Sequence, residues 1–310
     1  MAWLRLMRWQ NLIIIALTQL LAWWCVVLPQ GPQLLTLPHA LLLMASTVVI
    51  AAAGYIINDY FDVRIDQMNH PDTVVLGKTI ARKTAIKAHI AMNIVALLPA
   101  AWLAHKAGHR EWMVLQLFCI AMLWFYSTSY KRQYMTGNII VSLLTGLTIV
   151  ALFVYEPTLQ RLAKLPLAEM SRHAIRSSLP VWILLVYAGF AFLLTWIREI
   201  VKDMEDMEGD AAEGCLTMPI SRGLGYATGF ATVLAVAAMV PLVAGAVVLL
   251  RYGYLLVAGY ALALLALPLA AWVWYLRRGP ATPQHYHACS RLLKIIMVCG
   301  VCSLLIYKLQ

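Results

Sequence analysis

The order of apolar and polar positions divides the chain into long, continuous apolar stretches joined by shorter polar segments. An α-helix needs about 20 mostly apolar residues to cross the hydrocarbon core of a membrane. Nine stretches are close to that length: about 12–28, 39–57, 86–104, 112–128, 138–155, 179–197, 227–250, 254–275 and 290–307. Only helices and closed barrels satisfy the backbone in lipid, and these runs are continuous rather than alternating, which favours helices. The pattern therefore predicts an all-α, polytopic membrane protein with nine transmembrane helices.

Composition excludes a soluble protein of this size. Of the 310 residues, 62% are hydrophobic and only 12% are charged, whereas about a quarter of the residues of a soluble domain are charged. No small-residue cleavage pattern follows the first apolar run, which indicates a retained span rather than a removed leader. We expect one domain over residues 1–310, and the positions of two acidic segments suggest that 156–310 duplicates 1–155.

The distribution of charge indicates how the spans are oriented. With nine spans, sixteen of the 24 Lys and Arg residues lie on the side of the N-terminus, and the positive-inside rule assigns that side to the cytoplasm. Eleven of the 14 Asp and Glu residues fall in the segments after the second and sixth spans. Those segments are four spans apart, so they face the same compartment. We expect a protein of the cytoplasmic membrane whose N-terminus and acidic loops are cytoplasmic.

Two aspartate triplets of equal spacing occupy these acidic segments. They belong to the stretches NDYFDVRID, which begins at Asn58, and KDMEDMEGD, which begins at Lys202. The triplets are Asp59, Asp62 and Asp66 in the first stretch and Asp203, Asp206 and Asp210 in the second. Each steps by three residues and then by four, a spacing that keeps side chains on one face of an α-helix. One acid-rich segment is commonly a solvated turn, but two matched triplets on one side of the membrane predict a shared site.

Carboxylates gathered at a membrane repel one another, and a divalent cation removes that repulsion. Mg²⁺ prefers oxygen ligands and commonly bridges one or two carboxylates to phosphate oxygens. Two facing triplets predict about two Mg²⁺ ions with a diphosphate between them, with Asn58 adding an amide oxygen or donor. Nearby cations suited to phosphate are Arg64, Lys78, Lys131, Arg198 and Lys202.

A diphosphate on a lipid tail suits such a site, because the tail lies among the helices while the head stays at the wet rim. The chemistry expected is ionisation: metal and cations stabilise the departing diphosphate, and a nucleophile captures the allylic cation. Aromatic faces that would stabilise that cation are Trp196, Phe192, Tyr126 and Tyr187.

These residues resemble the motifs of the UbiA superfamily of intramembrane prenyltransferases. Asn58-Asp59-x-x-Asp62-x-x-x-Asp66 is similar to the first family motif, and Lys202-Asp203-x-x-Asp206-x-x-Gly209-Asp210 to the second. Further matches between the two are Tyr126-Ser127 with Lys131, and Gly137-Asn138. The resemblance covers essentially the whole chain. It implies a nine-helix bundle around a central cavity, cytoplasmic cap loops and Mg²⁺-dependent transfer of a polyprenyl group from its diphosphate.

The resemblance also implies roles for individual residues. The expected metal set is Asn58, Asp59, Asp62, Asp66, Asp203, Asp206 and Asp210, and all of these except Asn58 and Asp59 are expected to be catalytic. The expected diphosphate contacts are Asn58, Arg64, Lys78, Tyr126, Lys131 and Lys202, and the expected acceptor contacts are Arg8, Asn11 and Arg198. The expected partners are the lipid bilayer, a prenyl diphosphate and a lipophilic or small acceptor, with no nucleic acid. The oligomeric state is left open.

Two positions depart from the family pattern. Trp9 stands in the Arg8-x-x-Asn11 feature where proline is frequent, and Thr73-Val74 stands where the family often has Arg-Pro after the first motif. The second departure removes one phosphate-binding cation, which Lys78 or Arg82 would replace. The stretch REIVKDMEDMEGDAAEGCLTMPI is most similar to the branch that alkylates geranylgeranylglyceryl phosphate.

Other functions stay open at this point. Prenylation of an aromatic quinone precursor and a UbiA-type terpene cyclase would use the same motifs. An alcohol phosphatidyltransferase is disfavoured, because its aspartates lie in one contiguous motif whereas these triplets lie about 140 residues apart. A transporter of divalent cations or organic anions is disfavoured because the acids lie at span ends on one face rather than along a pathway.

Overall fold

The computed structural model describes residues 1–69, 71–72, 74–164 and 172–309. Over these residues the secondary structure is helical, with an isolated bridge between Leu76 and Ile80 and no strand. Within the same ranges, nine helices are long and apolar enough to cross a membrane, and each coincides with one of the nine predicted stretches. The prediction of an all-α integral membrane protein is therefore confirmed.

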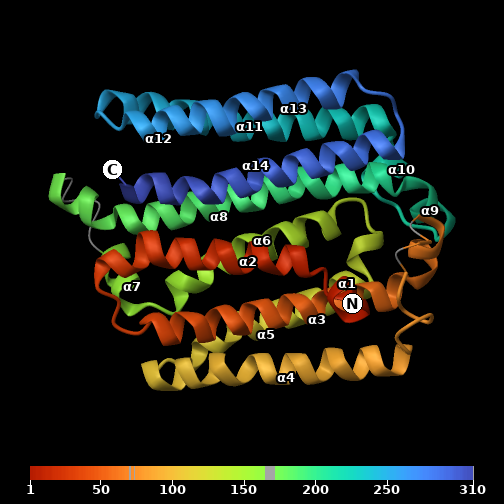
Figure 1. The fold of residues 1–310 in the computed structure, drawn as a ribbon, viewed down its shortest axis with the longest axis horizontal. Coiled ribbons are helices and arrows are strands. Elements are labelled where there is room, and N and C mark those ends of the chain that lie inside the picture. The colour runs from red at the N-terminus through yellow and green to blue at the C-terminus, as the bar shows by residue number, and fades with distance from the viewer. Residues whose placement is uncertain (70, 73, 165–171, 310) are drawn as a thin grey trace. The chain divides into compact units, whose positions relative to one another are not determined.

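The long helices run in the following order (Figure 1). They are α2 (Trp9–Ala22), continued by the η1 and η2 turns to Gln30, then α3 (Leu37–Asn69), α4 (Arg82–Ala107), α5 (Met113–Thr128), α6 (Thr136–Val154), α8 (Arg172–Glu205), α11 (Leu224–Arg251), α12 (Leu255–Tyr260) continued through η5 (Ala261–Ala266) into α13 (Leu267–Arg278), and α14 (Pro283–Leu309). The short elements are α1 (Ala2–Leu6), η3 (Arg110–Trp112), η4 (Tyr130–Arg132), α7 (Pro157–Ala163), α9 (Met207–Ala212) and α10 (Met218–Arg222).

Two helices extend beyond the apolar stretches that predicted them. α3 continues to Asn69 and α8 to Glu205, although the apolar runs end near 57 and 197. The acidic segments, expected as loops, are therefore largely helical. The apolar pattern marks where the lipid ends, whereas a helix ends at a residue that cannot continue it. The first proline after the first motif is Pro71, which is incompatible with a continuing helix.

The chain divides into two compact units, each described by itself. The first unit consists of residues 1–63, 73–128 and 144–189, and the second of residues 64–72, 129–143 and 190–310. Both units take residues from each predicted half, and the duplication of 1–155 in 156–310 stays a prediction. α3, α6 and α8 each contribute to both units.

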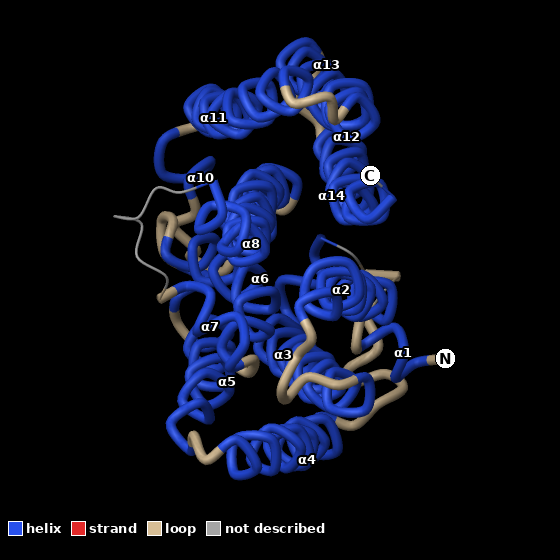
Figure 2. The backbone as a smooth tube through the Cα atoms, turned by 90° about the vertical axis from the view of Figure 1, so that its left-hand side faces the viewer, coloured by secondary structure: helices blue, strands red, loops and turns tan. Residues whose placement is uncertain are grey.

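Within the first unit, α4 lies beside α3 and α5 in both backbone views (Figure 2). Leu6 of α1, Ile56 of α3 and Leu76 of the following turn form a buried cluster with the start of α4. On the loop between α2 and α3, backbone N–H groups donate to the fully buried carboxylate of Glu156, which also caps α7. That unit is thus held by apolar packing at one place and by a buried carboxylate at another.

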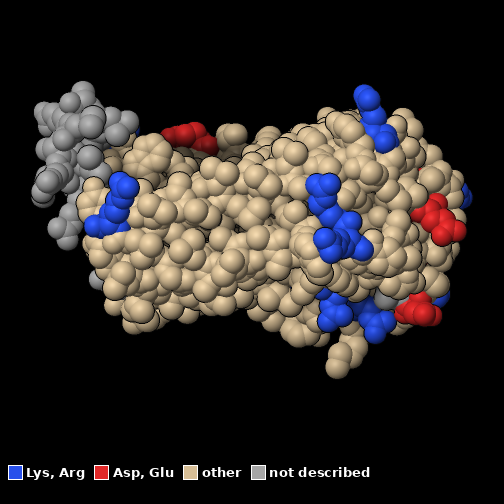
Figure 3. Space-filling model, turned by 90° about the horizontal axis from the view of Figure 1, so that it is seen from above, with Lys and Arg blue, Asp and Glu red and all other residues tan. Residues whose placement is uncertain are grey.

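Within the second unit, the core lies where α8, α11, α13 and α14 pack together. Ile197, Ala231, Trp272 and Leu293 are among its buried residues, and the Trp272 Nε1–H donates to the Cys289 carbonyl at 2.9 Å. α11 and α13 lie side by side, with α14 next to α13 (Figure 1). On the face drawn in Figure 3, a band without Lys, Arg, Asp or Glu separates the charged side chains toward one end of the helices from those toward the other, as a membrane requires.

Candidate functional site

The first aspartate motif lies on one uninterrupted helix. Asn58, Asp59, Asp62 and Asp66 all belong to α3, so the spacing prediction of one helical face is confirmed for this motif. The first three belong to the first unit, and Asp66 belongs to the second. Within the first unit, the Asp62 side chain is buried, and the buried Oδ1 of Asn58 has no hydrogen-bond partner among the residues described.

The second aspartate motif spans two helices rather than one. Asp203 lies in the last turn of α8, Asp206 lies at the break between α8 and α9, and Asp210 lies in α9. At the break, Asp206 has φ −93° and ψ 7°, a conformation between helix and turn. The backbone still donates from Asp206 to Lys202 at 2.8 Å and from Asp210 to Asp206 at 3.1 Å. A single helical face for this triplet is therefore wrong, because the helix is interrupted at its middle residue.

Within the second unit, the end of α3 meets the second motif (Figure 1). The Asn69 side chain bonds to the backbone of Asp206 at 3.1 Å and of Gly209 at 3.0 Å. This contact brings Asp66, one turn earlier in α3, within electrostatic range of Asp210. Within the second unit, the end of α3 that carries Asp66 therefore lies beside the second motif, through a contact between residues 140 positions apart in sequence.

Burial and neighbouring charges of both signs act on the pKa of Asp210. Burial raises the pKa of the Asp210 carboxyl to about 6. Repulsion from Asp206 and Asp66 adds to the rise, because it disfavours a further negative charge. Attraction to Lys131 and Lys202 opposes the rise. Two carboxyls and two ammonium groups therefore act on Asp210, and extra positive charge close to it would be favourable.

The turn that carries Lys131 is held against the start of α6 by a close backbone approach. A Cβ on Gly137 would lie 2.7 Å from the Lys131 Cα, a distance that side chains do not tolerate. The next residue, Asn138, is buried and donates from Nδ2 to the Asp203 carboxylate at 2.8 Å. Gly137 thus permits the position of Lys131, and Asn138 orients Asp203.

A second charged group lies one to two turns earlier on α8. Arg198 donates to the Glu199 carboxylate at 2.8 Å, and Lys202 lies 3.6 Å from the same carboxylate. The buried Nε of Arg198 has no hydrogen-bond partner in the part of the chain that is described. On the same helix, Trp196 packs against Phe192 with ring centroids 5.6 Å apart. Arg198 is therefore held by Glu199 at one end of its guanidinium, while its Nε is buried without a partner among the described residues.

The remaining predicted cations and the acceptor residues lie elsewhere. In the first unit, Arg8 donates to Asp59 at 2.8 Å and lies over the Tyr55 ring at 5.2 Å, so Asp59 is ion-paired. Arg82 lies over the Tyr60 ring and donates to its carbonyl. The other three predicted residues of that unit are Lys78, which is exposed, and Asn11 and Tyr126, which are half-buried. In the second unit, Arg64 is exposed, whereas Asp66 is half-buried.

Three residues of the site escaped the sequence reasoning: Asn69, Asn138 as a partner of Asp203, and Glu199. For Asn69 a signal exists, because it follows Asp66 by three residues and so extends the 59–62–66 stripe along the same helical face. Glu199 has no such signal, since acids near a cationic span end are common.

The residues fit a divalent cation that is shared with a ligand. No three His, Cys, Asp or Glu side chains within the described ranges lie close enough together to hold a metal by themselves. Mg²⁺ does not require that, because it keeps several waters and binds through one or two carboxylates plus phosphate oxygens. In the first unit the buried amide oxygen of Asn58, and in the second unit the Asp210 carboxyl with its raised pKa, are each a feature that a cation would satisfy.

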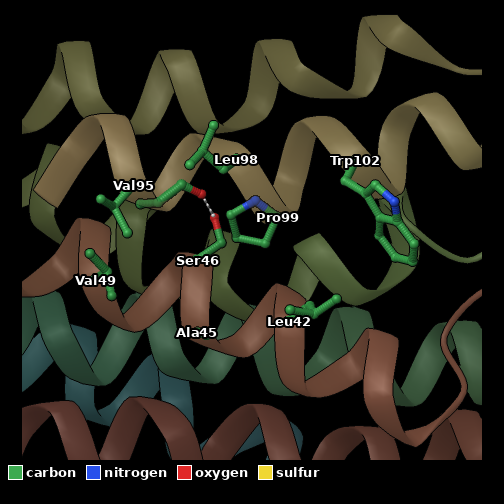
Figure 4. Close-up of a pocket in the computed structure, with 9 residues that line it drawn as sticks. Leu42, Ala45, Ser46, Val49, Val95, Leu98, Pro99 and Trp102 are labelled. Atoms are coloured by element: carbon green, nitrogen blue, oxygen red, sulfur yellow. Dashed lines mark hydrogen bonds between the residues drawn. The ribbon is translucent and has the colours of Figure 1, made fainter.

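The pocket drawn in Figure 4 is lined by none of the aspartate-motif residues. It lies between α3 and α4 in the first unit and has a volume of about 380 Å³. Its lining is Leu42, Ala45, Ser46, Val49, Val95, Ala96, Leu98, Pro99 and Trp102. The Ser46 hydroxyl donates to the Ala96 carbonyl at 2.7 Å, beside the helix proline Pro99. With this apolar lining, the pocket does not suit a diphosphate.

The model of the UbiA prenyltransferase family matches residues 12–295. The chain is 36% identical over 184 residues to the digeranylgeranylglyceryl phosphate synthase of Methanothermobacter thermautotrophicus, covering 59% of this chain and 56% of the relative. It is 31% identical over 198 residues to that of Methanopyrus kandleri, covering 64% and 63%. It is 31% identical over 270 residues to that of Ignicoccus hospitalis, covering 86% and 80%. The chain thus spans less than two thirds of the first two relatives and four fifths of the third.

Solved structures share the fold. A structure of digeranylgeranylglyceryl phosphate synthase matches with a TM-score of 0.62 and 24% identity, covering 99% of this chain and 96% of that one. An apo UbiA homologue from Aeropyrum pernix K1 matches with a TM-score of 0.63 and 18% identity, covering 93% and 94%. A UbiA homologue from Archaeoglobus fulgidus bound to GPP and Mg²⁺ matches with a TM-score of 0.57 and 15% identity, covering 98% and 99%.

Proposed function

Because the chain belongs to the UbiA prenyltransferase family, we propose that it transfers a polyprenyl group from an allylic prenyl diphosphate to a lipophilic acceptor. The observation that carries the proposal is the cluster of Asp66, Asp206 and Asp210 with Lys131 and Lys202 in the second unit. The relation to a UbiA homologue bound to GPP and Mg²⁺ supports a diphosphate and a divalent cation as its ligands.

In the proposed reaction the protein's own groups bind, orient and neutralise. Asn58, Asp59, Asp62, Asp66, Asp203, Asp206 and Asp210 are the residues that would hold about two Mg²⁺ ions. When bound, Mg²⁺ supplies positive charge that stabilises the departing diphosphate.

The other charged and polar residues serve the diphosphate and the cation. Lys131 and Lys202 contact phosphate oxygens, and the further proposed diphosphate contacts are Arg64, Lys78 and Tyr126. The carbon–oxygen bond of the donor breaks, diphosphate leaves with the electron pair, and the acceptor oxygen or carbon captures the allylic cation and loses a proton. Trp196 and Phe192 offer aromatic faces to that cation.

We infer that the acceptor carries a phosphate group, as does the product for which the relatives are named. Arg198 and Lys294 lie within electrostatic range of each other on α8 and α14, and the Nε of Arg198 is buried without a partner among the described residues. Two neighbouring cations suit an anionic ligand, which would relieve their repulsion. Arg8 and Asn11 are the further proposed acceptor contacts.

The test of the reaction uses purified protein with a long prenyl diphosphate, Mg²⁺ and three acceptors: a glyceryl phosphate ether, its dephosphorylated alcohol and an aromatic quinone precursor. We expect pyrophosphate release and a prenylated product with the phosphorylated acceptor. Asp66→Asn and Asp206→Asn should reduce turnover by about 100-fold, while Glu208→Gln, an exposed acid of α9, serves as the control.

Four outcomes would contradict parts of the proposal. Asp206→Asn protein as active as the parent would refute the metal-diphosphate site. Preference for the dephosphorylated alcohol or the quinone precursor would refute the acceptor assignment. Prenyl diphosphate consumption that needs no acceptor would indicate a terpene cyclase, and Mg²⁺ flux into proteoliposomes without turnover would indicate a transporter.

We also propose that the N-terminus and both aspartate motifs face the cytoplasm across the cell membrane. The sidedness of Lys and Arg supports this orientation. Fusion of a reporter that is active on one side of the membrane, placed at either terminus, tests it. With nine spans the two fusions should report opposite sides, the N-terminal fusion reporting the cytoplasm.

A further inference from the structure

The side chain of Asn69, the last residue of α3, reaches two backbone groups of the second motif. Its Nδ2 donates to the Asp206 carbonyl at 3.1 Å, and its Oδ1 accepts from the Gly209 N–H at 3.0 Å. All three residues belong to the second unit. We call this pair of hydrogen bonds the Asn69 clasp.

The clasp satisfies a group that α9 leaves without a partner. The first N–H groups of a helix have no intrahelical acceptor, and the side chain of the N-cap residue commonly accepts from the third of them. In α9 the N-cap is Asp206 and the third residue is Gly209, yet the Asp206 side chain makes no capping hydrogen bond. Asn69 accepts from that N–H instead. The Asp206 carboxylate is therefore not turned back onto its own helix.

The close approach of Asn69 explains the glycine at 209. Gly209 is buried. A Cβ added there would lie 2.6 Å from the Asn69 Cγ and would overlap the Asn69 Oδ1. No side chain fits while Asn69 occupies this position. Asn69 and Gly209 are thus a matched pair, and each explains why the other has the residue type it has.

We propose that Asn69 is a positioning residue that couples the two aspartate motifs. By capping α9 in place of Asp206, it keeps that carboxylate directed at the ligand and fixes the distance between Asp66 and Asp210. This role rests on the proposed function, because it concerns how the aspartates bind metal and diphosphate. Asn69 itself touches neither in this assignment.

A coupling role predicts a change in metal affinity rather than a change in stability alone. Groups that orient metal ligands cost about 10–100-fold in metal affinity when removed. Asn69→Ala should therefore raise the Mg²⁺ concentration needed for half-maximal turnover by at least about tenfold. Asn69→Ser, whose hydroxyl keeps one hydrogen bond, should lie between the parent and Asn69→Ala. Gln67→Ala, an exposed position on the same end of α3, is the matched control and should leave the affinity unchanged.

A double-mutant cycle with Gly209 tests the coupling directly. Gly209→Ala in the parent should weaken Mg²⁺ binding about as much as Asn69→Ala, because the added Cβ displaces the Asn69 side chain. In the Asn69→Ala background the same substitution should change the affinity by less than about twofold, since the obstructing side chain is gone. Additive effects of the two substitutions on the Mg²⁺ affinity would refute the role proposed for the Asn69 clasp.

Metal binding is also measured without turnover, by titration of Mn²⁺ followed by electron paramagnetic resonance, with the melting temperature recorded for each variant. Parent protein that binds Mn²⁺ and turns over, beside Asn69→Ala protein with unchanged Mn²⁺ affinity and a lowered melting temperature, would overturn the clasp while leaving the proposed function intact. Parent protein that binds no Mn²⁺ and consumes no prenyl diphosphate would overturn the proposed function and the clasp with it.

Discussion

Replacing Asp210 by asparagine should stabilise the metal-free protein while abolishing its activity. The pKa of Asp210 is raised from its ordinary 3.8 to about 6, with burial as the largest cause. Between these two values the folded protein binds more protons than the unfolded chain, so its stability falls as the pH rises. The free-energy cost of ionising the buried Asp210 carboxyl is absent below about pH 4 and complete above about pH 6. The amide that replaces the carboxyl in the variant carries no charge at any pH, so the penalty is removed.

The size of the effect follows from the shift. A shift of about two pKa units corresponds to about 3 kcal/mol at 1.4 kcal/mol per unit. Because Asp210 is half-buried and retains some contact with water, we expect about 2 kcal/mol in practice. That is a large fraction of the stability of a typical folded domain, which is about 5–15 kcal/mol.

The assay is thermal unfolding of purified protein in detergent with a chelator, at pH 7.5 and at pH 4.5. Asp210→Asn should raise the melting temperature at pH 7.5 by several degrees and raise it much less at pH 4.5. Added Mg²⁺ should then raise the melting temperature of the parent more than that of the variant. Glu208→Gln removes a neighbouring exposed charge and serves as the control. An Asp210→Asn protein that melts at or below the parent temperature at pH 7.5 would refute the charge balance described for the site.

Three further substitutions test the packing around the site and the far end of the first unit. Glu156→Gln should cost about 2–4 kcal/mol of unfolding free energy, because each carboxylate oxygen accepts from two backbone N–H groups and the amide nitrogen that replaces one oxygen accepts from neither; chemical denaturation measures it, and an unchanged midpoint would contradict the buried contact. Gly137→Ala should cost about 1–3 kcal/mol and raise the KM for the prenyl diphosphate, since its Cβ would displace Lys131; unchanged kinetics would show that the close approach is unimportant. Asn138→Ala should raise the Mg²⁺ requirement by about tenfold and lower the melting temperature, because it removes a buried hydrogen-bond partner of Asp203; an unaltered requirement would mean that Asp203 needs no orienting partner.

The local sequence pattern was sufficient to predict the membrane spans and the helical placement of the first motif. The nine helices follow from the length and continuity of the apolar runs, because lipid leaves the backbone of the described spans no alternative. The placement of Asp62 and Asp66 on one face follows from their four-residue spacing within the uninterrupted α3. Both inferences depend on neighbours in the sequence alone.

Contacts between residues that are distant in the sequence could not be predicted from these local patterns. The ion pair of Arg8 with Asp59 joins residues 51 positions apart, and it engages a carboxylate that spacing alone assigned to the metal. The bonds from Asn138 to Asp203 and from Asn69 to Gly209 span 65 and 140 positions. Spacing tells which side chains share a face of one helix, but not which face of another helix it meets.

The two aspartate triplets therefore have the same spacing but different physical origins of their geometry. In α3, intrahelical hydrogen bonds fix Asp62 relative to Asp66, so the first motif is specified locally. In the second motif the helix breaks at Asp206 within a segment rich in Met, Glu and Ala, which favour helix. Asp206 is itself a residue type that favours helix N-caps over helix interiors, and the Asn69 clasp adds a tertiary contact at that position. It follows that substitutions near the first motif should act mainly through the residue replaced, whereas the geometry of the second motif should respond to changes on α3 that never touch a carboxylate.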